Sequence, residues 1–341
     1  MNNLTNIIHR WDDIVKLSKG EMIWPSFCDF HTSNFCNQYC EGCAYDGMLG
    51  NQIMPKSDHF RIVDELLSVG VRAFDFAGGG EPSVIPYLPE LMRHIHEKNG
   101  YCGMITNGLI MGGSLIESLI YGATYVRFSL EASCEHDYSK YKRVAGQHWK
   151  KVLNNIVALR HAKEQIGSTL EISVKFAVGK SLRGVEHYNR CIELGRRLGA
   201  ERITIKALRH EPEELSIAER HEEDYILRNV IEREQADGLV SYWIAPLEEF
   251  QISQCWLNPV HTVIDWDGSV YICCYFYYGR KDELKIGNLM GRSFKEIWED
   301  KYHRFQINGI DKRNCLRVDC KFFHHHQAVH AGLIRGHMEF L

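Results

Sequence analysis

Between residues 27 and 210 the sequence alternates short apolar segments with amphipathic ones, and this alternation limits the possible folds more than any other feature. We expect strands at 71–77, 101–106, 124–131, 170–177 and 202–208, with helices between them. Such alternation builds a parallel sheet through right-handed crossovers. About six strand–helix units fit before residue 210, too few for a closed eight-stranded barrel. The prediction is an α/β fold, an open or partial barrel with its chemistry at the carboxyl ends of the strands.

Three of the expected strands alternate polar and apolar residues, so each has one polar face. The polar positions are Arg127, Ser129, Glu131, Glu171, Ser173, Lys175, Thr204 and Lys206. The apolar faces can pack on outer helices, which leaves the polar faces on the concave side of the sheet. Charged groups there are costly unless a polar ligand or water fills the space. We therefore predict a lumen for a polar ligand, with strands at a solvated sheet edge as the alternative.

Length, charge and composition exclude several classes of protein. The 341 residues carry a formal net charge of −4, so no basic face for nucleic acid is expected. No run of 18 apolar residues predicts a membrane helix, and the N-terminal extension 1–26 lacks the apolar core of a signal peptide. We therefore expect a cytoplasmic protein. Twelve cysteines in a reducing compartment favour metal binding or catalysis over disulfides.

The sequence pattern changes after the predicted barrel, which covers residues 27–210. Residues 211–249 are acidic and helical and are expected to connect two domains. Residues 250–341 contain short strands, an Asp267–Gly268 turn and a segment rich in cysteine and histidine, which predict a second, smaller domain. An Asp–Gly pair between two apolar runs is typical of a β-hairpin.

The strongest chemical signal is a group of three closely spaced cysteines, Cys36, Cys40 and Cys43, directly after an expected strand. Three thiolates within eight residues can hold one metal centre, but they supply one ligand too few for a four-coordinate site. The free position suits a metal site that binds and transforms a substrate. The alternatives are a zinc site completed by His31 or Asp46, and free thiols without a metal.

The spacing Cys36-x3-Cys40-x2-Cys43 on the first strand–helix loop resembles the signature of the radical S-adenosylmethionine (SAM) superfamily. The resemblance implies a partial (β/α)6 barrel and a [4Fe–4S] cluster held by the three cysteines, with SAM on the open iron. It also implies reductive cleavage of SAM to a 5′-deoxyadenosyl radical that abstracts a hydrogen atom. A flavodoxin- or ferredoxin-type protein is expected as the electron donor.

Further segments resemble motifs of this family and follow in the same order. Gly79-Gly80-Glu81-Pro82 resembles the GGEP segment. There the glycines allow close approach to the methionine part of SAM, and the glutamate accepts from its ammonium. By the same resemblance the other residues expected to bind SAM are Asn107, Ser129, Glu131 and Arg143.

One position departs from the family pattern. The residue before the third cysteine is usually aromatic in this family, and here it is Gly42. Contacts to adenine from this point are therefore not expected, and neighbouring Tyr39 or Tyr45 can substitute.

A second set of thiols lies in the C-terminal domain and comprises Cys255, Cys273, Cys315 and Cys320. Four thiols suit a closed site, and by themselves zinc and an iron–sulfur cluster fit equally well. The arrangement resembles the SPASM and twitch extensions of radical SAM enzymes. The twitch type, with one auxiliary [4Fe–4S] cluster, fits the number of cysteines best. The gap between Cys315 and Cys320 is wider than is common there, so Cys274 or His324 can take the place of Cys315.

The remaining thiols divide into one at the expected site and three in the expected core. Cys134 follows the strand that ends at Glu131, where a thiol could return a hydrogen atom to a substrate radical. The alternative for Cys134 is an inert loop cysteine. The expected core thiols are Cys28, Cys102 and Cys191.

Resemblance to twitch enzymes of antibiotic pathways implies an oxidoreductase or epimerase. Its substrate would be a small polar molecule (an aminocyclitol, aminoglycoside or nucleoside sugar) that undergoes dehydrogenation or epimerisation. The alternative is a maturase that modifies a ribosomally made peptide or protein. Only 35 residues precede Cys36, whereas such maturases often carry an N-terminal peptide-recognition domain, so the small molecule is favoured as partner. Neither nucleic acid nor a membrane is expected as a partner.

Overall fold

A computed structural model of the chain describes residues 8–209, 212–246, 255–277, 281–310, 313, 315 and 320–334. The chain divides into two compact units. The sheet unit comprises Phe30–Phe60 and Ala73–Pro246. The hairpin unit comprises Met1–Asp29, Arg61–Arg72 and Leu247–Leu341. Among the described helices none is both long and apolar enough to cross a membrane.

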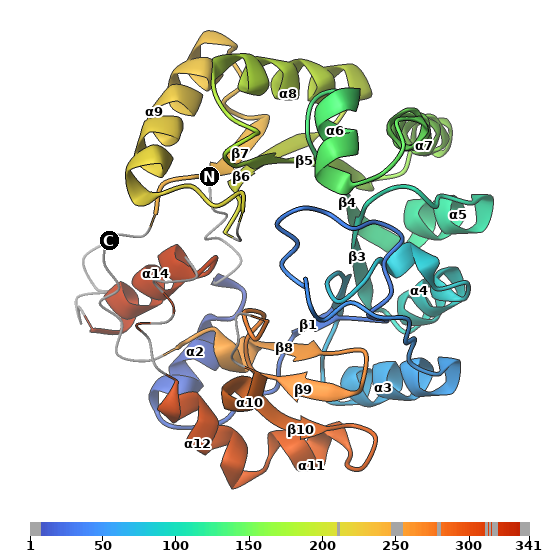
Figure 1. Cartoon of the computed structure of the whole chain (residues 1–341). Coiled ribbons are helices and arrows are strands. Elements are labelled where there is room, and N and C mark those ends of the chain that lie inside the picture. The colour runs from blue at the N-terminus through green and yellow to red at the C-terminus, as the bar shows by residue number, and fades with distance from the viewer. Residues whose placement is uncertain are drawn as a thin grey trace. The chain divides into compact units, whose positions relative to one another are not determined.

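The sheet unit is built on parallel strands in the order β2-β3-β4-β5-β6-β7 (Figure 1). The strands are β2 (Ala73–Phe76), β3 (Tyr101–Thr106), β4 (Ala123–Glu131), β5 (Glu171–Val178), β6 (Arg202–Ala207) and β7 (Val240–Trp243). The five strands expected from the sequence are confirmed, with β3 placed without any shift. Within the described residues β7 pairs only with β6, so the sheet is open and the expectation of an unclosed barrel holds.

Helices follow the strands and cover the outer side of this sheet (Figure 1). They are α4 (Leu88–Glu97), α5 (Gly113–Gly122), α6 (Glu135–Lys142), α7 (Gln147–Ile166), α8 (Val185–Leu198) and α9 (Ile217–Arg233), with a short 3-10 turn η1 (Pro82–Val84). In α7 the buried residues Trp149, Val152 and Ile156 recur at helical spacing. Such a stripe buries one face of the helix, and burial of each large apolar side chain contributes about 1.5–3 kcal/mol.

The structure confirms the alternation of polar and apolar positions along the strands. Val126, Phe128 and Leu130 of β4 are buried, whereas Arg127 and Ser129 are only partly buried. The same parity holds on β6, whereas on β5 Glu171 and Lys175 are partly buried but Ser173 is buried. The strand register aligns polar side chains across the sheet, and one such row contains Ser129, Lys175, Thr204 and Ser241.

The segment expected to be a helical connector contains a strand that the sequence did not predict. α9 accounts for the acidic, helical pattern, but Val240–Trp243 form β7 and pair in parallel with Ile203–Lys206 of β6. Four residues after a long acidic helix carry too short a pattern to be recognised as a strand. Residues 240–243 therefore extend the sheet.

The hairpin unit contains the antiparallel strands β8 (His261–Ile264), β9 (Ser269–Tyr271) and β10 (Lys285–Asn288). β8 and β9 form the expected hairpin, and Gly268 occupies its turn with φ of +78°. Most other residues avoid this left-handed conformation, so glycine suits the turn. The unit also contains α2 (Trp11–Ser18), most of β1 (Phe27–Phe30), η2 (Asn258–Val260), α10 (Lys281–Leu284), α11 (Phe294–Trp298), α12 (Lys301–Gly309) and α14 (Phe323–Ile334).

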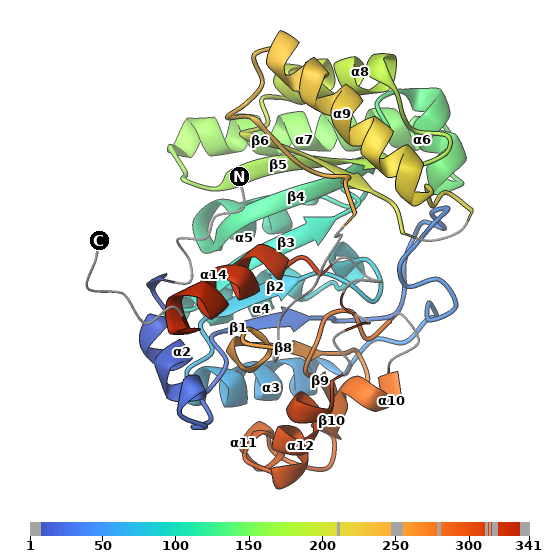
Figure 2. The same cartoon turned by 90° about the vertical axis from the view of Figure 1, so that its left-hand side faces the viewer.

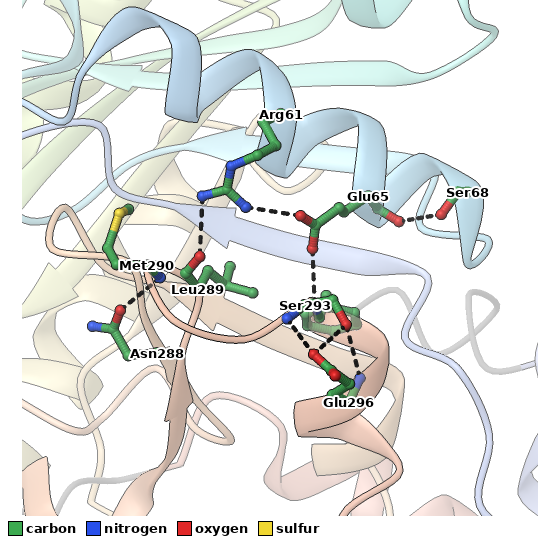
Figure 3. Close-up of polar contacts among 9 residues, drawn as sticks. Arg61, Glu65, Ser68, Asn288, Leu289, Met290, Ser293 and Glu296 are labelled. Carbon is green, nitrogen blue, oxygen red and sulfur yellow. Dashed lines mark hydrogen bonds and ion pairs between the residues drawn. The ribbon is translucent and has the colours of Figure 1, made fainter.

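An apolar core and a set of hydrogen bonds hold the hairpin unit together. α2 packs on α14 through Ile14 and Val329, with Trp256 and Leu257 in the same core. α3 (Lys56–Ser68) enters this unit at Arg61. Figure 3 shows Arg61 and Glu65 joined to the segment after β10. The Arg61 guanidinium donates to the Leu289 carbonyl at 3.0 Å, and the Glu65 carboxylate accepts from the Phe294 amide at 2.8 Å.

Candidate functional site

The three N-terminal cysteines lie on residues 31–55, the long loop between β1 and α3. Figure 2 shows this loop at the carboxyl ends of the sheet-unit strands, where the sequence placed the chemistry. Backbone hydrogen bonds fix it there. The Gly80 amide donates to the Ser33 carbonyl at 2.7 Å, and the Glu81 amide donates to the Phe35 carbonyl at 2.8 Å. The segment after β2 therefore holds the residues directly before Cys36.

Glycine is required at two positions where this segment meets the cysteine loop. A β-carbon at Gly80 would lie 1.9 Å from the Phe35 carbonyl oxygen, and one at Gly79 would lie 2.4 Å from the Ser33 carbonyl oxygen. Gly79 also has a positive φ of +63°. The glycines expected to approach SAM thus also let two backbones come together.

The thiols of Cys36, Cys40 and Cys43 are partly buried, and they lie near one buried cation, Lys142 of α6. Burial raises the pKa of the Cys36 thiol to about 12 and also raises the pKa of Cys43. Burial alone would lower the pKa of Lys142, but Cys40 and the Glu131 carboxylate raise it above its usual value. A side chain only 2% exposed therefore carries a positive charge beside the three sulfurs.

Lys142 was missed by the sequence analysis, which selected its neighbour Arg143. The Arg143 side chain is 60% exposed and pairs with Glu41 at 3.8 Å. Helical periodicity explains the difference, because Lys142 shares the buried face of α6 with Tyr138, four residues earlier. Arg143 ends the helix in a left-handed conformation with φ of +53°. This helical periodicity could have identified Lys142 from the sequence.

Glu131 ends β4 as a buried carboxylate with an unusual backbone. Its φ is +69°, a conformation that costs a non-glycine residue about 1–3 kcal/mol and is often found at functional sites. The Lys175 ammonium donates to both Glu131 oxygens, at 2.9 and 3.0 Å. Burial alone would raise the pKa of Glu131, but Lys175 and Lys142 lower it below its usual value. Glu131 is therefore held ionised.

Glu81 connects the ends of β2 and β3. Its Oε1 accepts from the Thr106 hydroxyl at 2.6 Å and from Ser83, and its Oε2 accepts from the Asn107 amide at 2.7 Å. The Asn107 side chain in turn donates to Asn37 in the cysteine loop at 2.6 Å. A buried carboxylate with several donors is strongly fixed, so Glu81 holds the strand ends in place.

The other polar residues of the sheet face lie at different positions between the start and the carboxyl end of their strands. Glu171, at the start of β5, pairs with Arg202 at 3.0 Å and lies away from the carboxyl ends. The partly buried Ser129 lies in the row with Lys175. Arg127 has a buried Nε without a hydrogen-bond partner among the described residues. At the carboxyl ends of β6 and β7, Lys206 and Arg209 both lie within 6 Å of the Trp243 ring, at 5.8 and 5.7 Å.

The remaining predicted residues of the sheet unit are placed as follows. Cys134 is the residue before α6, is partly exposed, and has its pKa raised by burial. Gly42 adopts a φ of +69°, which explains why glycine precedes the third cysteine. Tyr39 is 65% exposed, and the Tyr45 hydroxyl lies 3.5 Å from His31 Nε2. Cys102 and Cys191 are core residues, as expected, and so is Cys28 of the hairpin unit.

The second set of thiols shares one pocket in the hairpin unit. The pocket is lined by all four expected cysteines, Cys255, Cys273, Cys315 and Cys320. Cys274 is buried and its thiol contacts Cys273, and the exposed His324 pairs with Gln327 on its own helix. His326 lines the pocket instead, with burial lowering its pKa to about 4. Sequence analysis missed His326, although it shares a helix face with the buried residues Phe323 and Val329.

Both thiol sets fit iron–sulfur clusters by their number and chemistry. All twelve cysteines are free thiols, three of them on the N-terminal loop and four in the pocket. Thiolates are the usual cluster ligands, and four of them close a cluster whereas three leave one iron open. Within the ranges that the structure describes, no three His, Cys, Asp or Glu side chains lie close enough together to hold one metal ion.

Comparison with known proteins defines the class. Residues 30–172 match the family model of the radical SAM superfamily, and residues 255–321 match that of SPASM, an iron–sulfur cluster-binding domain. The chain therefore belongs to the radical SAM superfamily and carries a C-terminal SPASM domain. Its cofactors are accordingly a [4Fe–4S] cluster, SAM and auxiliary iron–sulfur clusters.

Two curated proteins are similar to parts of the chain. One is PqqA peptide cyclase of Granulibacter bethesdensis, 28% identical over 146 residues, which are 42% of this chain and 36% of that protein. The other is S-adenosyl-L-methionine-dependent tRNA 4-demethylwyosine synthase of Methanocaldococcus jannaschii, 33% identical over 88 residues, 25% of this chain and 26% of that protein. The chain thus spans about a third or less of each relative's length.

Solved structures share the fold at low identity. Streptococcus suis SuiB bound to precursor peptide SuiA superposes with a TM-score of 0.69 and 14% identity, covering 91% of this chain and 73% of that one. anSMEcpe with bound AdoMet gives 0.64 and 18%, covering 87% of both chains. At these identities the likeness shows the fold alone.

The expected partner, a small molecule in preference to a peptide, is wrong. One of the two similar curated proteins is named a peptide cyclase, and SuiB and anSMEcpe were each solved with a bound peptide. The expectation depended on the number of residues before Cys36. That number carries no information about a peptide bound by the sheet face or brought by another protein.

Proposed function

We propose that this chain is a radical SAM maturase that modifies a ribosomally made peptide or protein. The observation that carries the proposal is the similarity of its radical SAM region to a peptide cyclase, combined with a SPASM domain on the same chain. Both thiol sets that such an enzyme needs are present on the chain. The reaction class, bond formation within the peptide, is proposed from the same similarity.

We assign the N-terminal thiols Cys36, Cys40 and Cys43 to the [4Fe–4S] cluster. When bound there, the cluster and SAM supply hydrogen-atom abstraction from an unactivated C–H bond. Lys142 balances the negative charge that the thiolates bring into a buried site, because an uncompensated buried charge is costly. The hydrogen bonds from Gly80 and Glu81 to residues 33–35 fix the backbone before Cys36 and so hold the first sulfur in place.

We assign SAM to residues at or near the carboxyl ends of β2 to β4, which are Gly79, Gly80, Glu81, Asn107, Ser129 and Glu131, and to Arg143 at the end of α6. Glu131, held ionised by Lys175 and Lys142, can accept from hydroxyl or ammonium groups. Lys142 is better placed than the exposed Arg143 to meet a carboxylate inside the site. Fixed charges and donors of this kind orient a ligand without reorganising.

The carboxyl ends of β4 to β7 offer groups for a peptide. Lys206, Arg209 and Trp243 form a group of two cations and one aromatic ring there. Cations suit peptide carboxylates, and an indole suits apolar or aromatic side chains. Cys134, beside this region, remains our candidate for returning a hydrogen atom. We place the reaction in the cytoplasm, where the free thiols would stay reduced.

The proposal is tested with anaerobically reconstituted protein. With one N-terminal and one auxiliary [4Fe–4S] cluster we expect roughly eight irons per chain. Wild-type protein given SAM and dithionite should form 5′-deoxyadenosine, and the Cys36→Ala variant should form none while keeping roughly four irons. Peptides encoded beside the gene should then change mass with the wild type and not with Cys36→Ala.

Two results separate the levels of the proposal. If 5′-deoxyadenosine forms but no such peptide changes mass or accelerates SAM cleavage, the peptide substrate is refuted and the enzyme class stands. If Cys36→Ala still forms 5′-deoxyadenosine, the assignment of the N-terminal thiols is refuted as well.

A further inference from the structure

His326 is placed to act on the auxiliary cluster rather than to support the fold alone. It lies on α14, is 1% exposed, and lines the pocket that the four cysteines share. Its Nε2 lies 3.8 Å from the Cys255 sulfur, within hydrogen-bond distance for sulfur. Its Nδ1 lies 3.3 Å from the Trp256 amide nitrogen. Both ring nitrogens therefore face groups of the segment that begins with Cys255.

The backbone contact decides which nitrogen carries the proton. An amide N–H can only donate, so the Trp256 amide requires a lone pair on His326 Nδ1. A neutral imidazole with a lone pair on Nδ1 carries its hydrogen on Nε2. That hydrogen points toward the Cys255 sulfur. The same contact opposes metal ligation through Nε2. A neutral histidine that binds a metal through Nε2 carries its hydrogen on Nδ1, and that hydrogen would face the Trp256 amide, which is also a donor.

A histidine so oriented stabilises negative charge on the sulfur beside it. Reduction of an iron–sulfur cluster adds one electron, whose charge is shared by the cysteine sulfurs, and hydrogen bonds to those sulfurs help to set the reduction potential. An N–H donor favours the reduced state and raises the potential. Side chains such as Leu257, Ile272 and Phe322 line the same pocket, and an apolar surrounding strengthens a hydrogen bond to a charged group.

We propose that His326 is a positioning residue of the auxiliary site that donates an Nε2–H···S hydrogen bond to Cys255 and raises the reduction potential of the cluster held there. This assignment goes beyond the maturase function and does not depend on what the substrate is. The donor is held by the Trp256 backbone, so the bond does not rely on a second mobile side chain.

The test uses the full chain reconstituted anaerobically in the Cys36→Ala background, so that the auxiliary cluster alone is titrated. His326→Leu removes the donor, His326→Gln restores an N–H, and His324→Ala is the matched control, because His324 is exposed on the same helix. Each protein is titrated with dithionite and followed by electron paramagnetic resonance. We expect His326→Leu to lower the ratio of reduced to oxidised cluster about tenfold at the midpoint of its parent, about 59 mV for one electron.

The expected pattern is unchanged iron content and spectrum in all variants, partial recovery of the potential by His326→Gln, and no shift with His324→Ala. An unchanged potential in His326→Leu would refute the hydrogen bond. Loss of iron or a new spectrum would make His326 a ligand and also overturn the proposal. Independently of cluster loading, nitrogen-15 spectra of metal-free wild-type protein should show His326 protonated on Nε2. Protonation on Nδ1 would contradict the assignment even if the leucine variant does not fold.

Discussion

Replacing Gly80 by alanine tests the contact that carries the cysteine loop. The new methyl group would start 1.9 Å from the Phe35 carbonyl oxygen, whereas ordinary contacts begin at 3.4 Å, so one backbone must move by 1.5 Å. That movement breaks the two hydrogen bonds from residues 80 and 81 to residues 33 and 35. Two such bonds contribute about 1 kcal/mol each, and overpacking costs about 1–3 kcal/mol, together about 3–5 kcal/mol.

The chemical effect of Gly80→Ala should exceed the effect on stability. Phe35 directly precedes Cys36, so the same displacement moves the first cluster ligand. Misplacement of about 1 Å can lower a rate about 100-fold. We therefore expect loss of iron from the N-terminal site and 5′-deoxyadenosine formation at least about 100-fold slower, with auxiliary iron retained. The melting temperature of the sheet unit should fall by about 6 °C or more.

Gly113→Ala provides the matched control. Gly113 opens α5, its φ is not positive, and a β-carbon there meets no atom within 4 Å. Alanine should therefore leave iron and activity unchanged and stabilise the helix by about 0.4–1 kcal/mol. If Gly80→Ala retains full iron and a rate within twofold of wild type, the contact does not position Cys36 and this reasoning fails.

Other predictions concern charge, pH and hydrogen return. Lys175→Met leaves the buried Glu131 without its direct partner and should lower the free energy of unfolding in urea by about 3 kcal/mol. Lys175→Arg keeps the charge and should lower it by less than about 1 kcal/mol. Equal losses in the two variants would contradict the pairing. Burial lowers the pKa of His303 from 6.5 to about 4, so stability from this group is complete above pH 6.5. It should be lost as pH falls from 6.5 to 4, by about 3 kcal/mol in total, and His303→Gln should flatten the unfolding free energy over that interval. Cys134→Ala should preserve 5′-deoxyadenosine formation but stop product formation if Cys134 returns a hydrogen atom; normal product yield would exclude it.

Sequence periodicity was enough to find the fold because it reports burial directly. The alternation of Val126, Phe128 and Leu130 with polar neighbours predicted both the strand β4 and the face that packs on helices. β7 escaped because four residues hold too little pattern, and its identity depends on pairing with β6. Pairing between distant segments is not encoded in any local window.

Sequence motifs found the cysteines but did not reveal which residues around them are buried. Cys36, Cys40 and Cys43 are recognisable because ligand spacing is local. Whether Lys142 or Arg143 enters the site depends on which face of α6 is buried, and the motif does not state it. The choice between His324 and His326 has the same cause, since only a helix of known phase separates them. The substrate class depended on surfaces that no motif describes.

The backbone of Glu131 has a consequence for how this enzyme would respond to selection. A left-handed glutamate at the end of β4 lowers stability by about 1–3 kcal/mol, and glycine or asparagine would relieve that strain. A laboratory selection for heat resistance alone should therefore drift toward Gly or Asn at position 131. Selection for turnover should bring the carboxylate back.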